Sequence, residues 1–296
     1  MFLASPITFP NLGITVDPSP VAFTVFGKDI YWYGIIIASG FLLAVLYMLH
    51  RAKDFGVTQD DVLDMILWAV PIGVVCARLY YCIFYWELYE DDPISMLYIW
   101  EGGLAIYGGI IGGVITLLVV AKVKKIPAPV LLDLAGMGVI IGQCIGRWGN
   151  FMNREAFGAE TEIFCRMGLI APDGSSIYVH PTFLYESLWN LGILIFLIWF
   201  TKKGKRRYDG QCLLLYFLLY GLGRAWIEGL RTDSLYIGSS NIRISQALSL
   251  VLAGISLALL LYQSRRPHPP EDLFVNRVAT AEEAAGGKSE EENTET

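Results

Sequence analysis

The chain has 296 residues, of which 54% are hydrophobic and only 17% are charged, and its mean hydropathy is +0.49. This composition excludes an ordinary soluble protein and indicates a membrane protein. The net charge of −6 comes from residues 267–296, which hold eight acidic and two basic residues, so the rest of the chain is balanced.

Seven apolar runs follow one another along the chain. A helix that spans a bilayer needs about 20 apolar residues. We therefore expect an all-α, multi-pass membrane protein with seven transmembrane helices within residues 1–266. Residues 267–296 are polar and almost free of aromatic side chains, which predicts a disordered tail. The seven runs lie near residues 30–49, 62–84, 103–121, 129–146, 181–200, 210–229 and 242–262.

The connections between the runs alternate in charge. Those after the first, third, fifth and seventh runs carry twelve lysines and arginines, among them Lys53, Lys124 and Arg206. The connection after the second run is acidic around residues 87–92. Positively charged connections stay in the cytoplasm. The pattern therefore predicts an N-terminus outside and a C-terminus in the cytoplasm.

Two tyrosines stand at the starts of runs. Tyr33 opens the first run within an aromatic group, either as part of a membrane-interface belt or pointing inward. Tyr107 lies between glycine pairs at 102–103 and 108–109. Glycines of this kind allow close helix packing, which is the simpler explanation. The alternative is that these glycines, which have no side chain, let the backbone lie close to a bound ligand.

The segment from Gly146 to Gly158 follows directly on the fourth apolar run. Its 13 residues include two arginines, two asparagines, one glutamate and three glycines. An arginine at the rim of an apolar span is costly and is a functional candidate. Its planar fork of donors suits a lipid phosphate at headgroup depth. The alternative is an arginine that snorkels to the interface with a polar loop behind it. The candidate residues are Arg147, Asn150, Asn153, Glu155 and Gly158.

A second polar group lies toward the end of the sixth run. Tyr220, Arg224, Glu228 and Arg231 are spaced so that they fall along one helix face. A lone Arg224–Glu228 pair would often be structural. Two arginines directed to the same leaflet, Arg147 and Arg224, favour a shared anion site instead.

The remaining polar residues have simpler explanations. His180 opens the fifth run before Pro181, where capping or hydrogen bonding is more common than catalysis. Asp133 is a buried acid that we expect to pair with Arg78 or with a backbone donor. The sequence has no nucleotide-binding loop, hydrolase motif or Cys/His ligand cluster. We therefore expect no metal, no cofactor and no nucleic-acid partner.

Over residues 20–265 the chain resembles one family, the bacterial prolipoprotein diacylglyceryl transferases. This resemblance implies an enzyme that moves the diacylglyceryl group from phosphatidylglycerol to the thiol of the lipobox cysteine of a preprolipoprotein. Glycerol phosphate would be released, at a site toward the outer leaflet of the bacterial cytoplasmic membrane. The matching segments are Trp32-Tyr33-Gly34, the glycine pairs around Tyr107, Gly146–Gly158, His180-Pro181 with Leu184-Tyr185-Glu186, and Gly221–Arg231.

The resemblance also implies residue roles. Arg147 and Arg224 would bind the phosphate, and Glu155 and Glu228 would complete the catalytic group. The better-known members carry a histidine, proposed as the base, where this chain has Tyr107. A phenol of pKa about 10 is a poor base at neutral pH, so we expect Tyr107 to orient substrate. The substrate-binding candidates are Arg147, Asn150, Asn153, Gly158, Tyr33, Tyr220, Arg231 and His180.

Three questions stay open at this point. The thiol proton would go to Glu155, Glu228, His180 or a phosphate oxygen. A transporter with an anion pathway is the main alternative, although it needs polar residues through the whole depth of the membrane. A lipid-binding scaffold would need the arginines but not the Asn/Glu group beside them.

Overall fold

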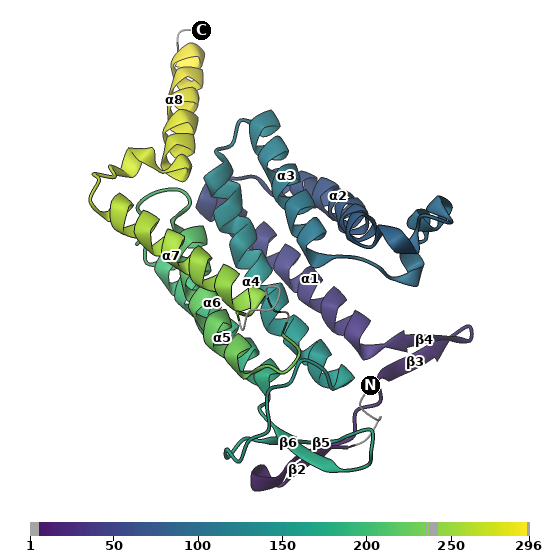
Figure 1. The fold of residues 1–296 in the computed structure, drawn as a ribbon. Coiled ribbons are helices and arrows are strands. Elements are labelled where there is room, and N and C mark those ends of the chain that lie inside the picture. The colour runs from purple at the N-terminus through teal and green to yellow at the C-terminus, as the bar shows by residue number, and fades with distance from the viewer. Residues whose placement is uncertain (1–5, 235, 237–241, 295–296) are drawn as a thin grey trace. The chain divides into compact units, whose positions relative to one another are not determined.

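Seven long apolar helices dominate the computed structural model, which describes residues 6–234, 236 and 242–294. Each is long and apolar enough to cross a membrane, so the expected seven spans and mostly helical, multi-pass fold are confirmed (Figure 1). The inside–outside orientation stays a prediction. The helices are α1 (Trp32–Arg51), α2 (Gln59–Phe84), α3 (Ile106–Lys124), α4 (Ala128–Asn153), α5 (Thr182–Lys202), α6 (Gln211–Leu230) and α7 (Ile244–Ser264).

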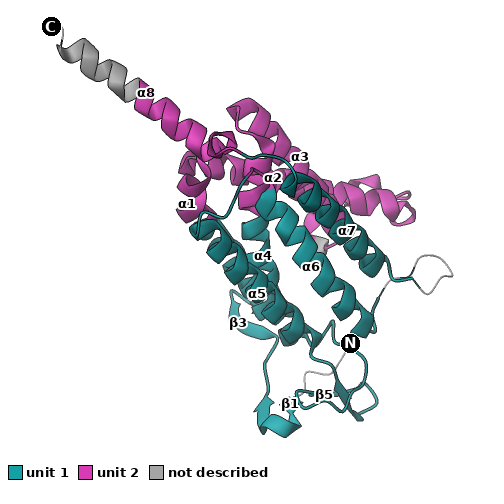
Figure 2. Cartoon of the chain, turned by 90° about the vertical axis from the view of Figure 1, so that its left-hand side faces the viewer, with its two compact units in different colours: residues 1–47, 136–207, 211–268 teal, residues 48–135, 208–210, 269–296 magenta. Residues whose placement is uncertain are grey.

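The chain forms two compact units (Figure 2). Unit 1 comprises residues 1–47, 136–207 and 211–268, and therefore contains α5, α6, α7 and most of α1 and α4. Unit 2 comprises residues 48–135, 208–210 and 269–296, with α2 and α3 at its centre.

In unit 2, α2 and α3 approach closely because α3 presents glycines to its neighbour. A Cβ atom on Gly108 would lie 2.3 Å from the carbonyl oxygen of Cys76. A Cβ atom on Gly112 would lie 2.9 Å from the Cys76 sulfur. Larger residues would push the helices apart, so packing accounts for these two glycines.

In unit 1, α6 makes equally close contacts on two sides. A Cβ atom on Gly221 would lie 2.6 Å from the carbonyl oxygen of Ser249 in α7. On the α5 side, the indole of Trp189 lies against Gly223 and donates a 2.9 Å hydrogen bond to the Leu219 carbonyl. These contacts fix α6 between its neighbours and so determine where Arg224 lies.

Unit 1 also contains six short strands that the sequence analysis did not predict. The strands β1 (Ile7–Phe9), β2 (Ile14–Val16), β5 (Met167–Ile170) and β6 (Ser176–Val179) form an antiparallel sheet in the order β2-β1-β5-β6. A separate hairpin joins β3 (Val21–Val25) and β4 (Lys28–Tyr31).

The four-stranded sheet packs against the ends of two spanning helices. Its buried residues, such as Ile7 and Leu169, form one apolar core with Phe151 of α4 and Phe183 of α5. The rings of Phe151 and Phe183 lie 4.7 Å apart. The sheet thereby anchors the connection between α4 and α5, which carries several of the candidate residues.

Short 3₁₀ helices and one further helix complete the fold. Residues 267–296 include α8 (Phe274–Thr294), which begins on unit 2, and the expected disorder of this tail stays a prediction. The Phe274 N–H donates to the Asp209 carboxylate at 3.1 Å, and Gly56 lies close against Val275. The 3₁₀ helices are η1 (Pro10–Leu12), η2 (Ala52–Phe55), η3 (Trp86–Leu88), η4 (Pro93–Leu97), η5 (Ile99–Glu101) and η6 (Pro270–Asp272).

Candidate functional site

Three spanning helices of unit 1 bring two arginines onto one glutamate. Arg147 of α4 contacts Glu186 of α5 at 2.5 Å between Nη2 and Oε1. Arg224 of α6 contacts the other oxygen of the same carboxylate at 2.8 Å between Nη1 and Oε2. Glu186 is only 2% exposed. The two arginines singled out in the sequence therefore share one buried site.

Two more residues of α6 join this site from the face predicted by their spacing. Arg224 makes a second ion pair, with Glu228 one turn further along α6, at 2.6 Å. One turn in the other direction, Tyr220 lies close enough to Arg147 and Arg224 for their charges to act on its hydroxyl. Arg224 and Glu228 do form an ion pair. This pair is part of a network with Arg147 and Glu186 and not an isolated structural pair.

The polar end of α4 extends the same network toward the surface. Arg147 donates through Nη1 to the Asn150 amide oxygen at 3.0 Å. The Asn150 amide nitrogen in turn donates to Glu155 at 2.8 Å, and Asn153 reaches the same carboxylate at 3.5 Å. Glu155 is exposed, so this end of the network is open to solvent.

The backbone after α4 explains how Glu155 reaches Asn150. Arg154 and Ala156 adopt left-handed φ angles of 54° and 57°, which turn the chain back on the helix. The Glu155 N–H donates to the Asn150 carbonyl at 3.0 Å. Arg154 itself is buried and donates to the Pro18 carbonyl at 3.0 Å, so this arginine ties down the loop.

Gly158 and Arg231 lie where two loops cross. They form an isolated backbone bridge, and the Gly158 N–H donates to the His180 carbonyl at 2.9 Å. A Cβ atom on Gly158 would lie 2.9 Å from the Leu230 carbonyl oxygen, so the crossing requires glycine. Close packing explains this residue without a ligand.

Arg231 is held by Asp233 through both ends of its fork. Its Nε and Nη2 atoms donate to the two Asp233 oxygens at 2.9 and 2.7 Å. Burial opposes the charge on Arg231, but these hydrogen bonds outweigh it and raise the pKa of Arg231. The same bonds lower the pKa of the Asp233 carboxyl. Arg231 is thus engaged in an ion pair at the edge of the site.

His180 makes local contacts rather than joining the arginines. The imidazole Nδ1 atom lies 3.3 Å from the Tyr185 hydroxyl. The backbone N–H of His180 donates to the Ala159 carbonyl at 3.0 Å. Burial lowers the pKa of the imidazole. These contacts agree with the hydrogen-bonding role expected from the sequence.

The two tyrosines at the starts of spans belong to different units. Tyr33 lies against Gly149 of α4, where a Cβ atom would come within 2.8 Å of the Tyr33 ring. Tyr33 therefore packs against the turn of α4 that carries Asn150. Tyr107 belongs to unit 2, where its ring lies 6.4 Å from that of Tyr80. Its role toward the arginines stays a prediction.

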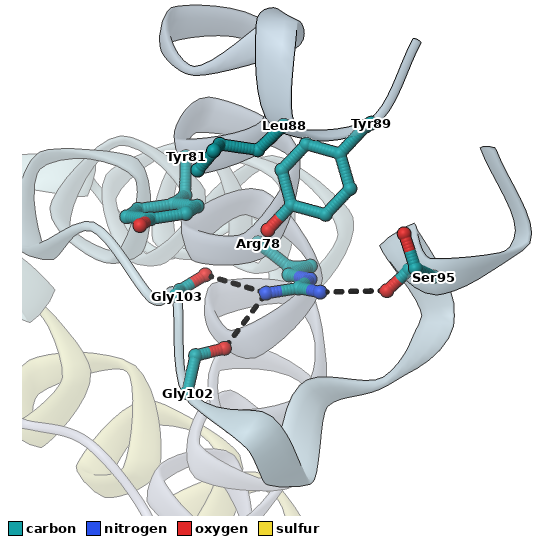
Figure 3. A pocket seen from close by; sticks show the side chains of 7 residues that line it. All are labelled: Arg78, Tyr81, Leu88, Tyr89, Ser95, Gly102 and Gly103. Carbon is teal, nitrogen blue, oxygen red and sulfur yellow. Dashed lines mark hydrogen bonds between the residues drawn. The ribbon is translucent and has the colours of Figure 1, made fainter. Parts of the chain in front are cut away.

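Unit 2 has a cavity of about 300 Å³ beside Arg78 (Figure 3). Arg78 donates to the carbonyl oxygens of Ser95, Met96, Gly102 and Gly103 at 2.7–3.2 Å. Arg78 therefore holds the connection that leads into α3.

Asp133, also in unit 2, accepts a 2.8 Å hydrogen bond from the Gly210 N–H. This is the backbone donor expected as the alternative partner of Asp133.

Two polar residues of α5 were assigned no role from the sequence. Glu186 joins the arginines, and Asn190, one turn further on, is fully buried with no hydrogen-bond partner among the described residues. An acid in the first two turns of an apolar span is a signal in itself. That signal identifies Glu186 as important, although it does not identify its partners.

Most of the chain is similar to proteins of one family. Residues 20–262 match the family model for prolipoprotein diacylglyceryl transferase. A phosphatidylglycerol–prolipoprotein diacylglyceryl transferase of Listeria welshimeri is 42% identical over 89% of this chain and 98% of its own length. Proteins with the same name from Clostridioides difficile and Limosilactobacillus reuteri are also 42% identical, over 85% and 88% of this chain and 99% and 96% of theirs.

Proposed function

Because the chain belongs to the prolipoprotein diacylglyceryl transferase family, we propose that it transfers the diacylglyceryl group of phosphatidylglycerol to a protein thiol. The acceptor is the lipobox cysteine of a preprolipoprotein. The products are a thioether-linked lipoprotein precursor and glycerol phosphate. No cofactor takes part in this reaction.

The observation that carries the proposal is the meeting of Arg147 and Arg224 on one buried carboxylate, at 2.5 and 2.8 Å. A phosphate has oxygens in a similar arrangement to accept from both guanidiniums. Held in this way, the phosphate gains negative charge as the C–O bond to the glyceryl group breaks. Fixed positive charge in a site of low polarity stabilises that change.

The other residues of the network have supporting roles. Asn150 holds Arg147, and Glu228 holds Arg224, so both forks are fixed before substrate arrives. Tyr220 lies near both arginines. Asn153 and Glu155 line the open end, and Tyr33 packs beside it. For Tyr107, which belongs to unit 2, we keep the expected role of a hydrogen-bond donor to phosphate or glyceryl oxygen. Gly158, His180 and Arg231 support the surrounding loops.

The site faces the outer leaflet of the bacterial cytoplasmic membrane in this proposal. Twelve basic residues on alternate connections support an N-terminus outside and a C-terminus in the cytoplasm. Residues 1–266 form the catalytic domain and residues 267–296 a cytoplasmic tail. Labelling of single cysteines tests the orientation. Residues near 90, 160 and 236 should react with an impermeant reagent from outside, and reaction near 204 would reverse the assignment.

A transfer assay tests the activity itself. Purified protein is mixed with phosphatidylglycerol and a lipobox peptide, and the peptide mass is followed. We expect the mass of one diacylglyceryl group to be added to the cysteine, and no addition to a peptide with serine in its place. Anion flux into liposomes without any mass change would indicate a transporter and overturn the proposal.

A further inference from the structure

The identity of the group that accepts the thiol proton is the question left by the absence of histidine at position 107. A thiol of pKa about 8.5 is mostly protonated at neutral pH, and only the thiolate is a strong nucleophile. Three side chains suggested by the sequence are Glu155, Glu228 and His180. The geometry favours a fourth.

Glu186 is the carboxylate that a bound phosphate would displace. Among the described residues, it alone contacts both Arg147 and Arg224. Glu228 contacts only Arg224, and Glu155 is exposed and held by asparagines. A phosphate that accepts from both guanidiniums takes over the two contacts that now balance the charge of Glu186.

Charge balance points the same way. Arg243 at the start of α7 donates to the Glu228 carbonyl and so also belongs to this neighbourhood. Among the described residues, the charged groups tied into the site are then four guanidiniums and four carboxylates, which balance. The neighbouring Arg154 pairs with Asp17 and leaves this balance unchanged. A phosphodiester adds one negative charge, and a buried, unpaired charge is costly. The added charge therefore favours the protonated form of the carboxylate that has lost its arginine partners, and this makes that carboxylate a better proton acceptor. The eight groups are Arg147, Arg224, Arg231, Arg243, Glu155, Glu186, Glu228 and Asp233.

Resting on the proposed function, we infer that Glu186 accepts the proton of the lipobox thiol once the lipid phosphate occupies Arg147 and Arg224. The S–H bond breaks and its proton moves to a Glu186 oxygen. The sulfur forms a bond with the glyceryl carbon as the C–O bond breaks, and that electron pair stays on the phosphate oxygen. The proton then passes to the departing phosphate, which returns Glu186 to its charged form and to both arginines.

Two variants test this role by the transfer assay, with kcat and KM for lipid measured across pH. Glu186→Gln keeps an acceptor for one arginine but cannot take a proton. We expect its kcat to fall at least a hundredfold with no rise in KM. Its remaining rate should climb about tenfold per pH unit below the pKa of the thiol, because only preformed thiolate reacts. Glu186→Asp keeps a carboxylate and should keep the shape of the parent pH profile.

A peptide with selenocysteine in place of the lipobox cysteine separates proton transfer from positioning. A selenol is already ionised at neutral pH and needs no acceptor. We expect the selenocysteine peptide to raise the rate of Glu186→Gln at least tenfold more than it raises the rate of the parent enzyme. The rate of Glu228→Gln should show no comparable gain.

Three outcomes would overturn the inference. The first is a raised KM with unchanged kcat in Glu186→Gln, which would make Glu186 a positioning residue. The second is a pH profile in that variant with the same shape as that of the parent enzyme. The third is a selenocysteine peptide that restores the rate of Glu228→Gln but not that of Glu186→Gln. Absence of transfer by the parent enzyme would instead contradict the proposed function.

Discussion

Replacing Arg147 by lysine tests whether the site needs the fork of a guanidinium rather than its charge. Arg147 serves Glu186 at 2.5 Å through Nη2 and Asn150 at 3.0 Å through Nη1. Lysine keeps the positive charge but is a single point on a flexible stem. It cannot hold both partners and a phosphate oxygen in one plane.

The size of the effect follows from the lost contact. One missing donor to a charge that develops in the transition state costs about 3 kcal/mol, which corresponds to about a hundredfold in rate. Arg147→Lys should therefore lose about a hundredfold in kcat/KM in the transfer assay. Arg224→Lys should lose a similar amount, because Arg224 also divides its fork between two carboxylates.

A matched control separates this effect from a general sensitivity to lysine. Arg166 lies in the connection between α4 and α5 and pairs with Glu162, whose side chain is 86% exposed. Arg166 also lies 4.8 Å from the centre of the Tyr178 ring. Neither contact involves Arg147, Arg224 or Glu186, so Arg166→Lys should keep turnover within about threefold. Thermal midpoints and yields of all three variants are compared with the parent. Near-parent kcat/KM in Arg147→Lys or Arg224→Lys would refute a phosphate-binding role for that arginine.

Three further predictions use the same assays. Tyr107→Phe should lower turnover about ten- to a hundredfold through loss of one hydrogen bond, and the pH–rate profile should keep its shape. Loss of a basic limb would instead make Tyr107 the base. Truncation after Arg266 should leave turnover unchanged, because no member of the charged network lies beyond it, but should lower the thermal midpoint through the lost contact of Phe274 with Asp209. A loss of turnover in detergent would give the tail a catalytic role. Because burial lowers the pKa of His180, its contribution to stability is fully present above about pH 6.5, the ordinary value, and is lost as pH falls through the folded-state value. The parent should thus lose more thermal stability than His180→Asn on acidification, and parallel curves would exclude that cause.

The sequence by itself was sufficient for the membrane-spanning plan. Span length and apolar composition follow from the thickness of the bilayer, so seven runs of about the right length gave seven helices. Helical periodicity also placed Tyr220, Arg224 and Glu228 on one face before any fold was known. The cost of an arginine in an apolar setting identified Arg147 and Arg224 as candidates. These features depend on residues close together in the chain, and local rules describe them well.

Tertiary structure decided how those candidates combine. The sequence could not reveal that Glu186, 39 residues from Arg147 and 38 from Arg224, joins the two arginines. Nor could it reveal the short strands, since β1 pairs Thr8 with Gly168 across the chain. The sequence also could not reveal that Gly158 lies at a crossing of two loops, where close packing requires glycine. Each of these contacts joins segments far apart in sequence, and only the packing of the folded chain brings them together.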